Sequence, residues 1–176
     1  TGQDALIALA SPANRQGRQV ADVLAGINRF NRGSIGSAIV RVFGLTAAST
    51  GLSEAQAKLA NLPIAVVHIT GKDHAAYYPG AKDLLLKLIF NPHSGEIYGA
   101  QGIGEKGVDK RIDIIATAIK GNLTIFDLPE LELTYAPPFG SAKDPINMLG
   151  YAAMNLAEGL SDNIQWHELK SYLAQG

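Results

Sequence analysis

Residues 135–147 read YAPPFGSAKDPIN, and their first half fits no regular secondary structure. Pro137 and Pro138 fix two consecutive φ angles and remove two amide donors, so this half is predicted to form a rigid, irregular loop. Pro145 suits the first turn of a helix, where an amide is not needed. The apolar residues around it recur at helical spacing, which predicts one buried helix face: Ile146, Leu149, Ala153 and Leu156.

The residues before this loop alternate between short apolar runs and helical patterns. Strands are predicted over 38–46, 64–69, 84–90, 97–103 and 131–134, with a hairpin turn at 91–95. Helices are predicted over 12–25 with Ser11 as N-cap, after a Ser53–Gln56 capping box, from Val108 to a stop at Gly121, and from Pro145. A loop over 74–81 carries two adjacent tyrosines. From the residues alone, the prediction is a soluble α+β domain.

Composition excludes several classes of function. The 176 residues carry 16 acidic and 15 basic side chains, a balance that argues against nucleic acid as a partner. No cysteine is present, so a disulfide scaffold, a thiolate metal site and a cysteine nucleophile within this chain are excluded. The four histidines share no metal-ligand spacing, so no metal is expected: His68, His74, His93 and His167. No apolar run is long enough to span a membrane, and a cytoplasmic location is expected.

Residues 102–107 read GIGEKG and match the dinucleotide-binding pattern G-x-G-x-x-G. Two interpretations are open: a phosphate-binding loop, or glycines that let a strand turn tightly into a closely packed helix. The second is favoured because the preceding strand is the second arm of a hairpin and not part of a parallel βαβ unit. The charged run 109–113 that follows is interpreted as the solvated face of the helix.

Two longer stretches resemble one known family. Residues 8–18 (ALASPANRQGR) resemble the end of the FAD-binding domain in pyridine nucleotide-disulfide oxidoreductases of the coenzyme A-disulfide reductase and NADH oxidase group, and residues 135–147 resemble the signature near the end of their dimerisation domain. Between them, residues 50–53, 77–82 and 104–113 resemble the same domain in the same order. Residues 161–176 are similar to the lead-in to a rhodanese module, fused at the C-terminus in some members.

The resemblance implies an antiparallel sheet with helices packed on one side, an α+β fold that forms a homodimer. It divides the chain into the tail of the FAD domain (1–30), the dimerisation domain (31–158), and a linker with the possible start of a rhodanese module (159–176). Ile146, Leu149, Tyr135 and the central helix are expected at the two-fold interface. The redox cysteine and the NAD(P)H domain are expected upstream of Thr1, so this piece alone is expected to be inactive.

The resemblance also implies residue roles. Tyr135, together with Tyr77 or Tyr78, is expected near the partner's redox cysteine, where a phenol could orient or protonate a departing thiolate. Anchoring of the interface is the alternative role of these tyrosines. Pro137 and Phe139 are assigned to the cofactor side, and Pro137 with Pro138 forms a rigid turn that presents Tyr135.

The helix after Ser11 is expected to direct backbone amides toward FAD, where negative charge grows on reduction. Leu9, Ala10 and Ala13 would supply these amides, and Asn14 and Arg15 would face the substrate cleft. An ordinary surface helix is the alternative.

Members similar to glutathione reductase have a His-Pro-Thr stretch and a following Glu where this chain has Tyr135-Ala136-Pro137. The resemblance therefore implies tyrosine-assisted chemistry with a single cysteine, through a persulfide, a mixed disulfide with coenzyme A or a sulfenic acid, three possibilities that stay open. The function implied is an FAD- and NAD(P)H-dependent reductase of disulfides, coenzyme A disulfide, polysulfides or persulfides. An NADH oxidase of the same group and a purely structural dimerisation module are the alternatives.

Overall fold

The computed structural model describes residues 6–174, which divide into two compact units, one ending at Gly36 and the other beginning at Ser37. The first unit contains α1 (Ala10–Leu24), which begins two residues earlier than predicted. Its N-cap is Leu9 and no side chain caps it, so the prediction of Ser11 as N-cap is wrong. The helix stops at Gly26, whose φ of 80° suits glycine, and the amide of Ile27 returns to the carbonyl of Asp22.

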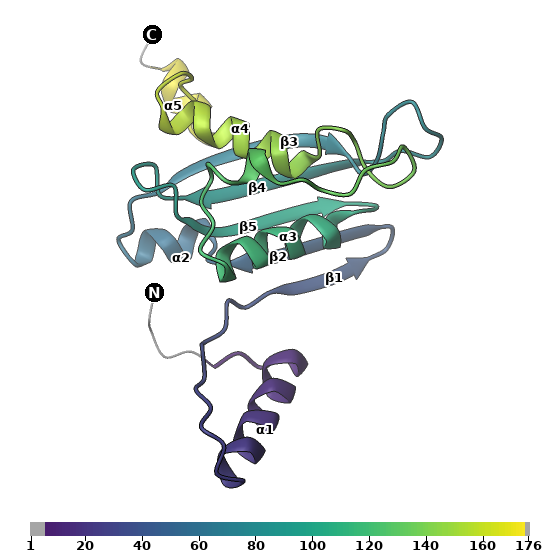
Figure 1. Cartoon of the computed structure of the whole chain (residues 1–176). Helices are drawn as coiled ribbons and strands as arrows, with labels where there is room; N and C mark the ends of the chain where they lie inside the picture. Colours follow the sequence, from purple (N-terminus) through teal and green to yellow (C-terminus); the bar gives the residue numbers. More distant parts are fainter. Residues whose placement is uncertain (1–5, 175–176) are drawn as a thin grey trace. The chain divides into compact units, whose positions relative to one another are not determined.

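The second unit is built on a five-stranded antiparallel sheet in the order β1-β2-β5-β4-β3 (Figure 1). The strands are β1 (Ala38–Val42), β2 (Leu45–Gly51), β3 (Ala65–Lys72), β4 (Asp83–Phe90) and β5 (Ile97–Gly104). The predicted hairpin at 91–95 joins β4 to β5 and is confirmed. The sheet with helices packed on it confirms the α+β fold.

Two predicted strands differ from the structure. The run 38–46 is not one strand, because Phe43 adopts a φ of 54° and the chain turns there from β1 into β2. Residues 131–134 form no strand. The side-chain amide of Asn147 donates to the carbonyl of Leu131 at 3.1 Å instead, which satisfies a backbone acceptor that a strand would have paired.

Two helices, α3 (Val108–Lys120) and α4 (Pro145–Ala157), cover one face of the sheet (Figure 1). The core between them is aliphatic and fully buried, and its central side chains are Leu84, Leu86, Leu88, Ile112, Ile115, Ile146 and Leu149. Ile146 and Leu149 have no exposed surface, so the expectation that they form a dimer interface is wrong; they lie on the side of α4 that packs against the sheet of their own chain.

A short helix, α2 (Glu54–Leu59), packs against the other face through Ala57, Val66 and Ile89. The predicted Ser53–Gln56 capping box begins this helix and is confirmed. A 3₁₀ turn, η1 (Leu128–Glu130), lies against α4, and α5 (Leu169–Leu173) follows near the C-terminus. Within residues 6–174, no helix is both long and apolar enough to cross a membrane.

The glycines of the GIGEKG stretch serve packing and turning. A Cβ on Gly102 would lie 3.0 Å from side-chain atoms of Leu86 and Val108, so glycine lets α3 approach the sheet closely. Gly107 has a φ of 72° and is the N-cap of α3. Because β5 pairs antiparallel with both of its neighbours, it is not part of a parallel βαβ unit, as the sequence predicted.

The charged run at the start of α3 is solvated only in part. Asp109 and Asp113 are exposed, but Arg111 retains only 1% of its surface. The prediction of a solvated face is therefore wrong for Arg111, which shares the inner face of α3 with Val108, Ile112 and Ile115.

Candidate functional site

Two loops that are far apart in sequence meet at one end of the second unit. The first runs from Asp73 to Lys82 and is closed at its base, where the amide of Asp73 donates to the carbonyl of Lys82 at 3.0 Å. The second is the loop around Pro137, in which the amide of Phe139 donates to the carbonyl of Ala136 at 2.8 Å. The amide of Ala75 donates to the carbonyl of Pro137 at 3.3 Å, which joins the loops.

This junction brings two of the predicted tyrosines together. The hydroxyl oxygens of Tyr77 and Tyr135 lie 3.1 Å apart, within hydrogen-bond distance, and both side chains are exposed. The hydrogen bond with Tyr135, reinforced by partial desolvation, raises the pKa of Tyr77 above its ordinary value. Tyr77 is therefore protonated at neutral pH.

Tyr78 points to a different partner. Its ring meets the ring of His74 edge to face, with centroids 5.8 Å apart and planes inclined by 75°. The choice between Tyr77 and Tyr78 is open in the sequence, but only Tyr77 has its hydroxyl beside that of Tyr135.

A buried histidine–aspartate pair lies at the base of the first loop. Nδ1 of His74 is 2.9 Å from Oδ2 of Asp73, and Oδ1 of Asp73 accepts from the amide of Lys82 at 2.6 Å. Burial raises the pKa of Asp73, but the hydrogen bonds from Lys82 and His74 outweigh it, so the pKa lies below its ordinary value. Asp73 is thus an anchored carboxylate at neutral pH.

Arg111, on α3, forms hydrogen bonds with residues of both loops. Its guanidinium forms a bidentate pair with Asp144, at 2.7 and 3.2 Å, and donates to the carbonyl of Asp73 at 2.9 Å. Asp144 caps α4 at the end of the second loop, through a capping box with Asn147. One buried side chain therefore fixes the start of the first loop, at Asp73, relative to the start of α4, at Asp144.

A concave surface adjoins Tyr135. Its volume is approximately 380 Å³, and it is lined by Lys110, Thr134, Tyr135, Ala136 and Phe139. Nζ of Lys110 lies 3.5 Å from the carbonyl of Phe139, so a positive charge lines the same concavity as Tyr135. Pro137 shapes this loop without lining the concavity.

The predicted residues of the first unit have their own contacts. The amide of Leu9 donates to the carbonyl of Ile7, and that of Ala13 donates to the carbonyl of Leu9. The amide of Ala10 has no backbone partner in the described part of the chain. Asn14 donates to the carbonyl of Ala10, and Arg15 donates to the carbonyl of Gly33 and to Ser34.

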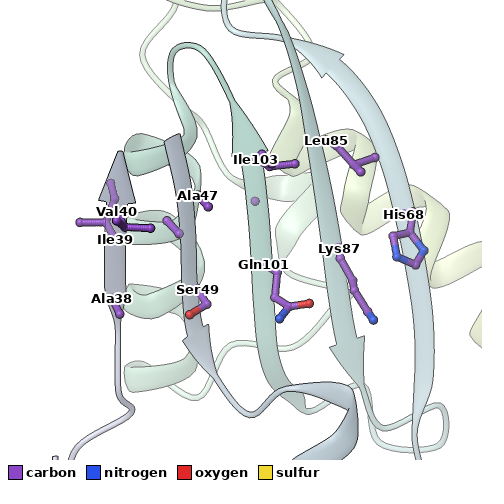
Figure 2. A pocket seen from close by; sticks show the side chains of 12 residues that line it. Ala38, Ile39, Val40, Ala47, Ser49, His68, Leu85, Lys87, Gln101 and Ile103 are labelled. Atoms are coloured by element: carbon purple, nitrogen blue, oxygen red, sulfur yellow. The ribbon is translucent and has the colours of Figure 1, made fainter. Parts of the chain in front are cut away.

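The face of the sheet opposite α3 and α4 holds an open groove of approximately 530 Å³ (Figure 2). Strand register aligns a polar row across it, formed by Ser49, Gln101, Lys87 and His68. Lys87 also pairs with Glu54 of α2 at 2.6 Å. None of the predicted site residues lines this groove, and no group of three or more potential metal ligands occurs among the described residues. The tyrosine junction is therefore the candidate site.

A family model described as "Pyridine nucleotide-disulphide oxidoreductase, dimerisation domain" matches residues 37–144, more than half of the chain. The chain belongs to this family. The match covers the whole sheet, α3 and both tyrosines of the junction, so the dimerisation domain carries the candidate site.

Curated relatives and solved structures agree with this assignment. The chain is 37% identical over 153 residues to a coenzyme A disulfide reductase of Staphylococcus haemolyticus, covering 86% of this chain and 34% of the relative. The chain thus spans about a third of the length of the curated relatives that it matches. Reduced CoADR-RHD of Bacillus anthracis superposes with a TM-score of 0.97 at 54% identity, over 100% of this chain and 32% of that one.

Two further structures extend the comparison. A NAD-dependent persulfide reductase from A. fulgidus superposes with a TM-score of 0.93 at 41% identity, over 97% of this chain and 32% of that one. A water-forming NADH oxidase from Lactobacillus brevis superposes with a TM-score of 0.85 at 26% identity, over 91% and 36%. The family is therefore one of oxidoreductases, as the resemblance implied.

The sequence alone does not predict four residues of the site, which are Asp73, His74, Lys110 and Arg111. Arg111 carried a usable signal, because it lies three residues after Val108 and directly before Ile112 on the apolar face of α3. Asp73 and His74 directly precede the loop of the two tyrosines, but an adjacent Asp-His pair has no distinguishing spacing.

Proposed function

We propose that this chain is the C-terminal part of an FAD- and NAD(P)H-dependent reductase of disulfide, coenzyme A disulfide or persulfide substrates. Residues 31–158 form its homodimer interface and bring Tyr77 and Tyr135 into the partner's active site. The observation that carries the proposal is the pair of exposed phenol hydroxyls 3.1 Å apart, on a domain of an oxidoreductase family. Coenzyme A disulfide and persulfide are the substrate classes favoured by the relatives.

The paired phenols suit sulfur chemistry. When a disulfide or persulfide bond is cleaved, one sulfur leaves as a thiolate, which needs a hydrogen-bond donor or a proton. Within the pair, one hydroxyl donates to the other, and the accepting hydroxyl keeps its own hydrogen for the sulfur. The raised pKa of Tyr77 keeps its own hydroxyl protonated and unable to compete as a nucleophile.

FAD would supply electron transfer from NAD(P)H to the substrate sulfur. In α1, the amide of Ala10, which has no backbone partner within residues 6–174, fits a flavin oxygen that gains negative charge. The dipole of this 15-residue helix favours the same charge. The amides of Leu9 and Ala13 already donate within their own unit, so Ala10 is the first choice among the three. Asn14 and Arg15 in the substrate cleft, and Pro137 and Phe139 on the cofactor side, remain parts of the proposal.

This chain contains no cysteine, so it holds no thiol that could carry the sulfur intermediate. We therefore expect it to be inactive without the rest of the reductase, and a rhodanese module after residue 159 would favour persulfide as substrate. An NADH oxidase of the same group and a purely structural dimerisation module are the alternatives.

The decisive experiment is Tyr135→Phe in the full-length reductase. Loss of the hydroxyl should lower kcat with a disulfide or persulfide substrate by about 100-fold, the scale of general acid catalysis, while flavin content and the dimer stay unchanged. Tyr172→Phe, at an exposed position in α5, is the matched control. Normal turnover of Tyr135→Phe would leave the structural module as the function of this domain.

A further inference from the structure

The His74–Asp73 pair lies beneath the tyrosines, and the proposed chemistry does not use it. We infer that His74 is a positioning residue that fixes the Tyr77–Tyr135 pair through the ring of Tyr78. This inference rests on the proposed function, because it concerns how the same site is held in its working geometry.

The hydrogen bonds define the state of the imidazole. Asp73 is a carboxylate, which only accepts, so Nδ1 of His74 carries a hydrogen and donates to it at 2.9 Å. Nε2 is fully buried and has no hydrogen-bond partner among the described residues.

Histidine at this position carries a cost, because its buried Nε2 has no hydrogen-bond partner among the described residues. A phenylalanine would avoid that cost and keep a ring against Tyr78, but it would leave Oδ2 of Asp73 without the hydrogen bond from Nδ1. Histidine provides an aromatic ring whose orientation is fixed by the hydrogen bond that it donates to Asp73.

The contacts run from this ring to the tyrosine pair. Asp73 is fixed at three atoms: its amide and Oδ1 bond to Lys82, and its carbonyl accepts from Arg111. The hydrogen bond to Asp73 therefore fixes the ring of His74, which packs edge to face against Tyr78. The amide of Tyr78 donates to the carbonyl of Ala75 at 2.9 Å, and Ala75 in turn bonds to Pro137. Tyr77 lies inside this turn, so its hydroxyl is placed by the contacts on both sides of it.

A double-mutant cycle in the full-length reductase tests the inference. His74→Phe keeps an aromatic ring and loses the bond to Asp73, whereas His74→Asn can keep a donor to Asp73 and loses the ring. Each should lower kcat about tenfold with the KM for NAD(P)H unchanged, since a displacement of about 1 Å at a reacting group can cost about 100-fold. In a Tyr135→Phe background the same changes should lower kcat less than about twofold, because residues that act through one another are not additive.

The outcomes separate this inference from the proposed function. If Tyr135→Phe alone has no effect, the proposed function fails. If Tyr135→Phe is slow and the His74 changes lower kcat by the same factor in both backgrounds, only the positioning role is overturned. His93→Phe, at the exposed turn between β4 and β5, should leave kcat unchanged and serves as control.

A spectroscopic measurement in the same protein does not depend on turnover. With tyrosines labelled with carbon-13 at Cζ, the resonance of Tyr77 should titrate above the ordinary pKa in the parent, as the hydrogen bond to Tyr135 requires, and should move back toward the ordinary value in His74→Phe and His74→Asn. An unchanged titration of Tyr77 in both variants would overturn the inference.

Discussion

At the scale of single residues, Arg111 connects α3 to the loop at Asp73 and to the start of α4, although it lies in a charged run of the sequence. Within the described residues, its buried charge is compensated by Asp144 and two backbone carbonyls. Arg111→Met would leave the buried carboxylate of Asp144 with Lys110, 3.9 Å away, as its remaining cation, and breaking a buried pair in this way typically costs about 3–5 kcal/mol. Urea denaturation measures this loss. Lys72→Met removes an exposed pair with Asp83 and should cost no more than about 1 kcal/mol; equal losses would contradict the assigned role of Arg111.

Glu54 links stability to pH. Hydrogen bonds from Lys58 and Lys87 lower the pKa of Glu54 from 4.5 to about 2. Because the folded pKa is the lower one, this stabilisation is complete above pH 4.5 and is lost as the pH falls toward 2. Glu54→Gln should therefore destabilise the protein at pH 6, and the difference in free energy of unfolding should shrink between pH 4.5 and 2. Asp83→Asn, at an exposed ion pair, should change this dependence little; a difference that is constant with pH would contradict the argument.

The candidate site shows which residue-scale features a sequence can supply. Tyr135 and the adjacent tyrosines were found through their resemblance to a family motif. Their pairing depends on a contact across 58 residues, and the bond between Ala75 and Pro137 that creates it involves only backbone atoms. Side-chain identity cannot encode such a contact directly, so the choice of Tyr77 over Tyr78 needed the structure.

At the scale of elements, β5 and α3 depend on the close approach that Gly102 allows. Gly102→Ala would place a methyl group 3.0 Å from buried atoms of Leu86 and Val108, and such overpacking typically costs about 1–3 kcal/mol. Gly44→Ala, in the turn between β1 and β2, meets no atom within 4 Å and should be much milder. Thermal unfolding of both variants distinguishes them, and a neutral Gly102→Ala would argue against a packing role.

The same geometry predicts that GIGEKG binds no dinucleotide. Gly102 packs against α3, and a Cβ on Gly107 would lie 2.5 Å from the Arg111 guanidinium. Both glycines are therefore required by packing within the domain. Calorimetric titration of the 176-residue chain with NADH should give no heat of binding. A saturable heat would reinstate the phosphate-loop interpretation.

Elements with strong periodicity were predictable, and those that depend on distant side chains were not. The hairpin between β4 and β5, the capping box of α2 and the ends of α3 follow from local sequence and match the structure. The split of β1 from β2 at Phe43 was missed because a bulky residue at positive φ is not a typical turn signal. Residues 131–134 are apolar enough to predict a strand, but the side-chain amide of Asn147 on α4 donates to the carbonyl of Leu131.

At the scale of the whole molecule, assembly is the main expectation. Ile146 and Leu149 are consumed by the core, whereas Met148 and Tyr151 on the same helix remain exposed. In the full-length reductase, Met148→Asp should weaken a dimer that uses this face of α4, because a carboxylate would be buried in it. Sedimentation across a concentration series measures the change, with Asp162→Asn near the C-terminus as control. A dimer unaffected by Met148→Asp would place the interface elsewhere on residues 31–158.

The bond between Tyr77 and Tyr135 has a consequence for how the chain folds. A contact that closes a loop of 58 residues pays a large entropic cost, so it is expected to form late, after the β4–β5 hairpin and the local turns of the helices. The phenol pair is therefore a reporter of the finished topology. Tyrosine fluorescence or the pH titration of these two hydroxyls would distinguish the native state from compact intermediates that already contain the sheet. During synthesis, the site cannot form before residue 135 has been translated.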